Sequence, residues 1–169
     1  MNLQSYVCGH WQSGEGEGIA MRDATTGEII ALATSNGIDF AAVLEYSRDV
    51  GGPALRALTF HQRATMLRAL AKKLSELKEE FYALSYRTGA TKNDALIDID
   101  GGIGTLFAFA GKGSRELPNS HVYVDGDVEG LSKGGTFVGQ HLYVSREGAA
   151  IHINAFNFPV WGIDRKSVV

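Results

Sequence analysis

The chain has 169 residues, of which 44% are hydrophobic and 21% charged, and its formal net charge is −3 at pH 7. This composition is typical of a globular domain and excludes a strongly basic nucleic-acid-binding surface. No apolar run reaches the roughly 20 residues that a membrane-spanning helix needs, and a single cysteine, Cys8, excludes an internal disulfide. We therefore predict a cytoplasmic protein with neither nucleic-acid nor membrane partners.

The first 37 residues are predicted to form short strands joined by turns. Apolar residues occupy stretches 5–8, 19–23 and 28–33, and alternating glycines and glutamates make residues 14–18 a polar loop. Gly27, in the sequence ATTGE, suits the tight turn of a β-hairpin. The pattern predicts a small antiparallel ribbon at the start of the chain.

Two helices are predicted after the ribbon. Asp39 is a candidate N-cap for a helix that runs to Val50 and ends at the Gly-Gly-Pro sequence of residues 51–53. Thr59 and Gln62 then form a capping box, which opens a longer helix that runs to about Gly89. Apolar residues of this second helix recur at steps of three and four, as expected for one buried stripe. The stripe consists of Leu67, Leu70, Leu74, Leu77, Phe81 and Leu84.

A third helix is predicted to begin at Thr91 and Asp94. Its apolar side carries Leu96, Ile99, Ile103, Leu106, Phe107 and Ala110. Gly101, Gly102 and Gly104 interrupt it, and each costs about 1 kcal/mol against alanine in a helix interior. These glycines indicate either close approach of a ligand or, as we favour, tight packing against a neighbouring element. They are not a dinucleotide loop, because no strand precedes them.

Beyond Pro118 the apolar period changes from helical to alternating. Residues 121–125 and 136–146 are predicted to be strands with alternating faces. Residues 149–153 are almost entirely apolar, which is typical of a short strand buried on both faces of a parallel α/β sheet.

Most chemistry-bearing residues have structural explanations. The five histidines are scattered, without the spacing of a metal site and without a serine nucleophile elbow, so we predict no metal ligands. His152 is interpreted as a strand residue with a hydrogen-bonded ring. Cys8 lies in an N-terminal strand with no evident base, which favours a small buried hydrophobe over a nucleophile.

Asn157 is the candidate catalytic residue. It follows the apolar strand and precedes Phe158 and Pro159, and proline is favoured at the first position of a helix. A side-chain amide at a strand-to-helix junction has two N–H donors that can stabilise an oxyanion. The same position also suits a helix cap or a turn brace. From the residues alone, both roles remain open.

The sequence from Ile153 to Pro159, INAFNFP, resembles the Ile-x-Pro-Trp-Asn-Phe-Pro motif of the aldehyde dehydrogenases. The order of the preceding elements is similar as well, so the resemblance covers essentially residues 3–162. Ala155 and Phe156 replace the commoner Pro-Trp. With the N-terminal sequence SYVCGHWQSGEGEG, these replacements resemble the bifunctional phenylacetate-degradation enzymes, in which a hydratase-like domain is joined to the dehydrogenase and the substrate is a ring-opened CoA-thioester semialdehyde.

The resemblance implies an α/β fold, the N-terminal part of an aldehyde dehydrogenase: antiparallel ribbon, helices, oligomerisation strands and the first strand of a Rossmann-like domain, incomplete. It implies an oxidoreductase in which a cysteine thiolate attacks the aldehyde, hydride passes to NADP or NAD, and water releases the acid. Asn157 would stabilise the oxyanion of the thiohemiacetal, and Ile153, Asn154, Ala155 and Phe156 would line the nicotinamide-ribose side of the cofactor. The two longer strands would form the oligomerisation ribbon of a homo-oligomer.

The sequence also departs from the family pattern. The family places its nucleophilic cysteine, its general-base glutamate and its cofactor-binding lysine downstream of this stretch. Residues 1–162 follow the pattern, whereas residues 163–169 diverge from it and are interpreted as a truncation or a change of reading frame. The expectation is an inactive fragment of an aldehyde dehydrogenase. The alternative is a non-catalytic interaction module that pairs with intact subunits through the strand at residues 136–146.

Overall fold

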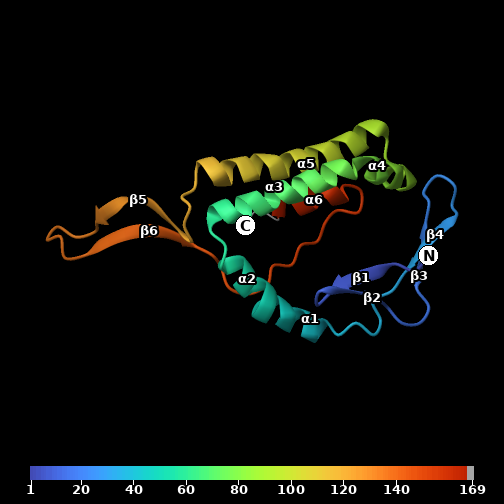
Figure 1. The fold of residues 1–169 in the computed structure, drawn as a ribbon, viewed down its shortest axis with the longest axis horizontal. Helices are drawn as coiled ribbons and strands as arrows, with labels where there is room; N and C mark the ends of the chain where they lie inside the picture. Colours follow the sequence, from blue (N-terminus) through green and yellow to red (C-terminus); the bar gives the residue numbers. More distant parts are fainter. Residues whose placement is uncertain (167–169) are drawn as a thin grey trace.

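The computed structural model describes the backbone of residues 1–166 and the side chains of residues 1–162. The strands are β1 Gln4–Val7, β2 His10–Ser13, β3 Ile19–Arg22, β4 Ile29–Ala33, β5 Val122–Gly130 and β6 Val138–Val144. The helices are α1 Phe40–Tyr46, the π-helical η1 Ser47–Gly51, α2 Gly52–Arg56, α3 Phe60–Glu76, α4 Lys78–Arg87, α5 Lys92–Arg115 and α6 Pro159–Lys166. In Figure 1, α3 and α5 lie side by side, and the β5–β6 hairpin extends away from them.

The predicted N-terminal ribbon is confirmed as two antiparallel hairpins, β1–β2 and β3–β4. Gly27 in the second hairpin turn has a φ of 75°, a left-handed conformation that glycine adopts without a steric penalty. The Leu3 N–H donates to the Leu32 carbonyl at 2.8 Å, and the Leu32 N–H donates to the Met1 carbonyl at 2.9 Å. The two hairpins therefore lie next to each other.

The first helical region begins as predicted but does not end as predicted. The Asp39 carboxylate accepts from the Ala42 N–H at 3.0 Å and caps α1. The prediction that residues 51–53 end this helix is wrong, because the backbone stays helical through η1 and into α2. Pro53 stands in the first turn of α2, where its missing N–H costs little. A Gly-Gly-Pro sequence therefore joins two helices here.

The second helical region carries the predicted capping box. The Thr59 N–H donates to the Gln62 side chain at 2.8 Å, and the Gln62 N–H donates to the Thr59 hydroxyl at 3.3 Å. One continuous helix to Gly89 is wrong, since Leu77 (φ −97°, ψ 2°) separates α3 from α4. After this break, Phe81 and Tyr82 both pack against α5. Apolar periodicity did not reveal the break because the packing partner is distant in sequence.

The core lies along α5, which starts after Thr91 as predicted and is capped by a box of Thr91 and Asp94. Ala95, Ile99 and Ile103 form its central cluster, with Leu106 and Ala110 buried along the same face. The prediction that Leu96 and Phe107 belong to the buried side of this helix is wrong. They are 51% and 38% exposed because both lie beside the buried rows, at the same edge of the apolar face. In the stripe on the preceding helices, Leu70 and Leu84 are also exposed.

Packing explains some of the α5 glycines. Gly102 is buried, and a Cβ added at Gly101 would lie 3.9 Å from the Trp161 ring. At Gly104 a Cβ would meet nothing within 4 Å. The packing explanation therefore fits Gly101 and Gly102, and nothing in the structure explains Gly104.

The two predicted longer strands are confirmed as β5 and β6, which pair antiparallel and form one hairpin arm. Tyr123 lies opposite Tyr143, with ring centroids 5.9 Å apart, and Val124 lies opposite Leu142. β5 continues to Gly130, beyond the predicted end, with a register shift between Asp125 and Glu129. Apolar side chains on both strands remain exposed.

The predicted buried strand at residues 149–153, the first strand of a Rossmann-like domain, is not formed and this expectation is wrong for the structure. These residues belong to no strand, and Ile151 and Ile153 are 85% and 80% exposed. A parallel strand is stable only between neighbouring strands that satisfy its N–H and C=O groups. The described residues place no strand beside this segment. His152 is likewise exposed.

Candidate functional site

Asn157 lies in a short turn immediately before α6. An antiparallel bridge between Ala155 and Phe158 closes the turn, and the helix begins at Pro159 as predicted. The Asn157 side chain is exposed, and no hydrogen bond joins it to another residue that the structure describes. Its amide group is therefore available to an external acceptor.

A buried carboxylate from α5 caps the start of α6. The two oxygens of Asp98 accept from the N–H of Trp161 at 2.8 Å and from the N–H of Val160 at 3.3 Å. Asp98 is only 3% exposed, and these bonds compensate the burial of its charge. The amide groups that a capping Asn157 would satisfy are thus bound by Asp98. The capping role considered for Asn157 is wrong.

Sequence reasoning missed Asp98, although a signal for it exists. Asp98 stands three residues after Ala95 and four before Gly102, both of which are buried on the same face of α5. An aspartate in the buried row of an amphipathic helix requires a partner. The sequence does not show that this partner is a helix terminus more than 60 residues away.

The residues after Pro159 attach the site segment to α5. The Val160 side chain packs against the Ala95–Ile99–Ile103 cluster, and the Trp161 ring lies where a Cβ added at Gly101 would come into van der Waals contact with it. The next residue, Gly162, faces Asn154: a Cβ there would lie 2.8 Å from the Asn154 Oδ1. The segment before the turn therefore folds back on α6.

The four predicted cofactor-binding residues divide into two kinds. Ile153, Ala155 and Phe156 are exposed, and Phe156 reaches 91%. Asn154 is half-buried, and its Oδ1 is buried without a hydrogen-bond partner among the described residues. The structure thus brings these residues and Asn157 together in one loop, with Asn154 directed inward against Gly162.

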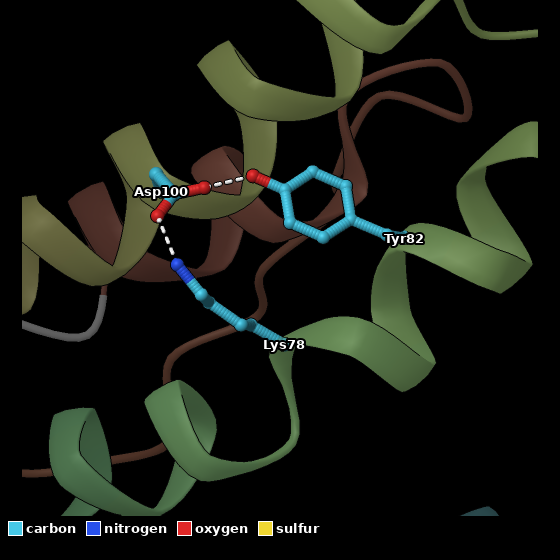
Figure 2. A network of polar contacts seen from close by, with 3 residues as sticks. All are labelled: Lys78, Tyr82 and Asp100. Carbon is cyan, nitrogen blue, oxygen red and sulfur yellow. Dashed lines mark hydrogen bonds and ion pairs between the residues drawn. The ribbon is translucent and has the colours of Figure 1, made fainter.

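A second polar link joins α4 to α5 (Figure 2). Asp100 accepts a hydrogen bond from the Tyr82 hydroxyl, and its other oxygen lies 3.1 Å from the Lys78 ammonium. The bond from Tyr82, aided by Lys78, lowers the pKa of Asp100 against the effect of burial. The same bond is the main cause that raises the pKa of Tyr82 to about 12. Tyr82 also packs against the α5 cluster, so the group has a structural role.

Other features of the described residues do not form a site. No group of three or more His, Cys, Asp or Glu among them is arranged to hold a metal ion. Cys8 is half-buried in the β1–β2 turn with a φ of 48°, and the following Gly9 approaches the Tyr46 hydroxyl of α1. The surface hollows adjoin the N-terminal hairpins and are lined by residues such as Asn2, Leu32 and Thr34. No described helix is long and apolar enough to cross a membrane.

Comparison with known proteins assigns the sequence to a family. The aldehyde dehydrogenase family matches residues 11–168. A 3,4-dehydroadipyl-CoA semialdehyde dehydrogenase from Aromatoleum evansii is 43% identical over 168 residues, which is 99% of this chain. The chain spans 32% of the length of that relative. Its helices and small antiparallel sheets are the N-terminal part of the family's domain, and the chain belongs to the aldehyde dehydrogenase family.

Proposed function

We propose that this chain supplies the oxyanion-binding asparagine and part of the cofactor-binding face of an NAD(P)+-dependent aldehyde dehydrogenase that oxidises a CoA-linked semialdehyde. The family supports the reaction type. The substrate class is supported by the relative at 43% identity, which is named for a CoA-linked semialdehyde.

The proposal rests on the side-chain amide of Asn157, which forms no hydrogen bond with another described residue. Its side chain is exposed in a closed turn, and Asp98 already satisfies the helix terminus behind it. When a thiolate adds to an aldehyde, the carbonyl oxygen becomes an oxyanion, and a fixed N–H donor stabilises it more than it stabilises the uncharged carbonyl. Asn157 has a donor for this purpose, and the turn limits its movement.

The residues of the loop fit a nicotinamide cofactor. Ile153 and Phe156 expose apolar surface that can lie against a flat ring. Asn154 keeps the loop in contact with Gly162. When bound, NAD(P)+ accepts the hydride from the aldehyde carbon. The loop would hold and orient the cofactor, and Asn157 would hold the substrate oxygen.

The chain alone is expected to be inactive. The reaction needs a nucleophilic thiolate close to Asn157. Cys8, the single cysteine, lies in a hairpin turn against α1. The purified chain, incubated with an aldehyde and NAD+ or NADP+, should give no increase in the absorbance of reduced cofactor. Turnover by the chain alone would contradict this expectation.

The role of Asn157 is best tested in a chimera. The 168 aligned residues of this chain would replace the corresponding segment of the Aromatoleum evansii relative, and turnover of a CoA-linked semialdehyde would be measured. Asn157→Ala should lower kcat about 10²-fold with a small change in KM, because the donor acts mainly in the transition state. Asn93→Ala, at an exposed position on α5, is the matched control and should leave kcat unchanged. An unchanged kcat in Asn157→Ala would contradict the proposal.

A second candidate function, a non-catalytic module that pairs with intact subunits, is favoured by the β5–β6 arm. Val124, Leu142 and Val144 are at least half exposed on it. Size-exclusion chromatography of the chain with and without the intact enzyme discriminates between the two functions. Co-elution would support pairing, whereas separate elution of both proteins would count against it.

A further inference from the structure

We propose that Asp98 is the positioning residue of the Asn157 turn. It acts as a remote N-cap of α6 and thereby fixes the residues that precede the helix. The consequence for catalysis rests on the function proposed above for Asn157. The structural part of the proposal rests only on the contacts of Asp98.

The first step of the argument is that α6 lacks a cap of its own. The residue before the helix is Phe158, whose side chain has no hydrogen-bond acceptor. Pro159 has no N–H, and no acidic residue stands in the first turn. The next two amide groups, those of Val160 and Trp161, are the donors that an N-cap side chain ordinarily satisfies. Asp98 accepts from both.

The second step concerns the charge of Asp98. A carboxylate that is 3% exposed loses its hydration and requires compensation from the protein. Both of its oxygens face the N-terminus of α6, where the helix dipole adds to the two N–H bonds. Its neighbour Asp100 points instead to Lys78 and Tyr82 of α4. Within the described residues, the hydrogen bonds of Asp98 are therefore directed at α6 alone.

The third step connects α6 to Asn157. Pro159 has a fixed φ and restricts Phe158, and the bridge between Ala155 and Phe158 closes the turn around Asn157. Two residues thus separate Asn157 from the first capped amide. Val160 also packs on the α5 cluster, so a side-chain contact and a main-chain bond hold the same residue. The position of the first turn of α6 therefore determines the position of the Asn157 turn.

The experiment is NMR spectroscopy of the uniformly ¹⁵N-labelled chain. Asp98→Ala removes both acceptors, and Asp98→Asn keeps one while placing an amide donor opposite a backbone N–H. Hydrogen-exchange protection of the Val160 and Trp161 amides should fall about 5- to 10-fold in Asp98→Ala, the effect expected for loss of an N-cap, and less in Asp98→Asn. The heteronuclear ¹H–¹⁵N NOE of the Asn157 backbone amide should also fall more in Asp98→Ala than in Asp98→Asn. Unchanged protection and an unchanged NOE in both variants would overturn the proposal.

Two further variants separate capping from general stability. Asp100→Asn, on the same helix and in contact with α4, should leave protection of Val160 and Trp161 unchanged. Phe158→Ser, added to Asp98→Ala, supplies a local N-cap oxygen and should restore part of the protection. A residue that merely filled space would not be rescued in this way. Equal losses in Asp98→Ala and Asp100→Asn, together with no rescue, would overturn the capping role.

Kinetics of the chimera test the link to catalysis. If Asp98 acts through Asn157, Asp98→Ala should lower kcat, and the double variant Asp98→Ala, Asn157→Ala should be no slower than Asn157→Ala. If kcat of the double variant falls by the product of the two separate reductions, the positioning role is overturned. If Asn157→Ala leaves kcat unchanged while Asp98→Ala loses amide protection, the proposed function fails and the capping of α6 stands.

Discussion

Two aspartates on one helix show how position decides the role of a residue. Asp98 and Asp100 are two residues apart, so their side chains leave α5 about 200° apart. Asp98 is buried and bonds to the start of α6, whereas Asp100 is partly exposed and bonds to α4. Together they connect α5 to both neighbouring helices through hydrogen bonds.

The bond between Tyr82 and Asp100 predicts a pH dependence of stability. The pKa of Tyr82 is raised to about 12 in the folded protein, mainly because its hydroxyl donates to Asp100. A raised pKa means that the stabilisation is complete below the unfolded value of about 10 and is lost as the pH rises through the folded value. We expect Tm to fall more steeply from pH 10 to 12 in the wild type than in Tyr82→Phe. Parallel curves for the two proteins would contradict this.

Sequence reasoning succeeded for local residue roles and failed for distant ones. Asp39, Thr59 and Thr91 were predicted as helix caps, because the acceptor and the amide it satisfies lie within three residues. Asp98 was missed because its donors are 62 and 63 residues away. The same limit left a helix-capping role for Asn157 open until the cap of α6 was known.

At the scale of elements, the capping boxes are the clearest link between sequence and fold. In the box of α5, the Thr91 hydroxyl accepts from the Asp94 N–H at 3.2 Å, and the Asp94 carboxylate accepts from the Thr91 N–H at 3.2 Å. This box begins the helix that carries the core and both aspartates.

Removing the α5 cap should weaken the whole molecule. We expect Thr91→Ala to lower the free energy of unfolding by about 1 kcal/mol, because buried residues along α5 depend on this helix. Thr65→Ala is the control: its hydroxyl bonds back to the His61 carbonyl within α3, and its loss should be nearly neutral. Urea unfolding followed by circular dichroism measures both variants. Equal midpoints for Thr91→Ala and Thr65→Ala would contradict the expectation.

The errors in predicted elements share one cause. The break at Leu77, the helical passage through residues 51–53 and the missing strand at residues 149–153 all depend on what packs beside them. Apolar periodicity indicates that a segment has a face to bury. It does not identify the partner, and a strand in particular exists only with a neighbour.

At the scale of the whole molecule, the helices bury apolar side chains in a common core, whereas the β5–β6 arm leaves its apolar side chains exposed. α3, α4, α5 and α6 share this core, and the arm projects away from these helices (Figure 1). Val124 and Leu142 lie opposite each other and are 50% and 57% exposed. Apolar residues arranged in this way on a hairpin are typical of an interface.

The arm therefore predicts concentration-dependent association. We expect the chain to self-associate, and the double variant Val124→Thr, Leu142→Thr to shift it toward the monomer while strand propensity is kept. Ile19→Thr, at a 78% exposed position on the N-terminal hairpin, is the control and should associate as the wild type does. Multi-angle light scattering over a range of concentrations gives the mass. A monomeric wild type at all concentrations would contradict the role of the arm.

The remote cap of α6 also sets an order of folding. A helix of eight residues is unstable by itself in water, and this one has no local residue to start it. Its acceptor becomes available only when α5 has formed and the chain has folded back to bring together Asp98 and Val160, which are 62 positions apart; this is an entropically costly, late event. The Asn157 turn is therefore expected to be among the last parts of the molecule to acquire its shape, after the helices on which it rests.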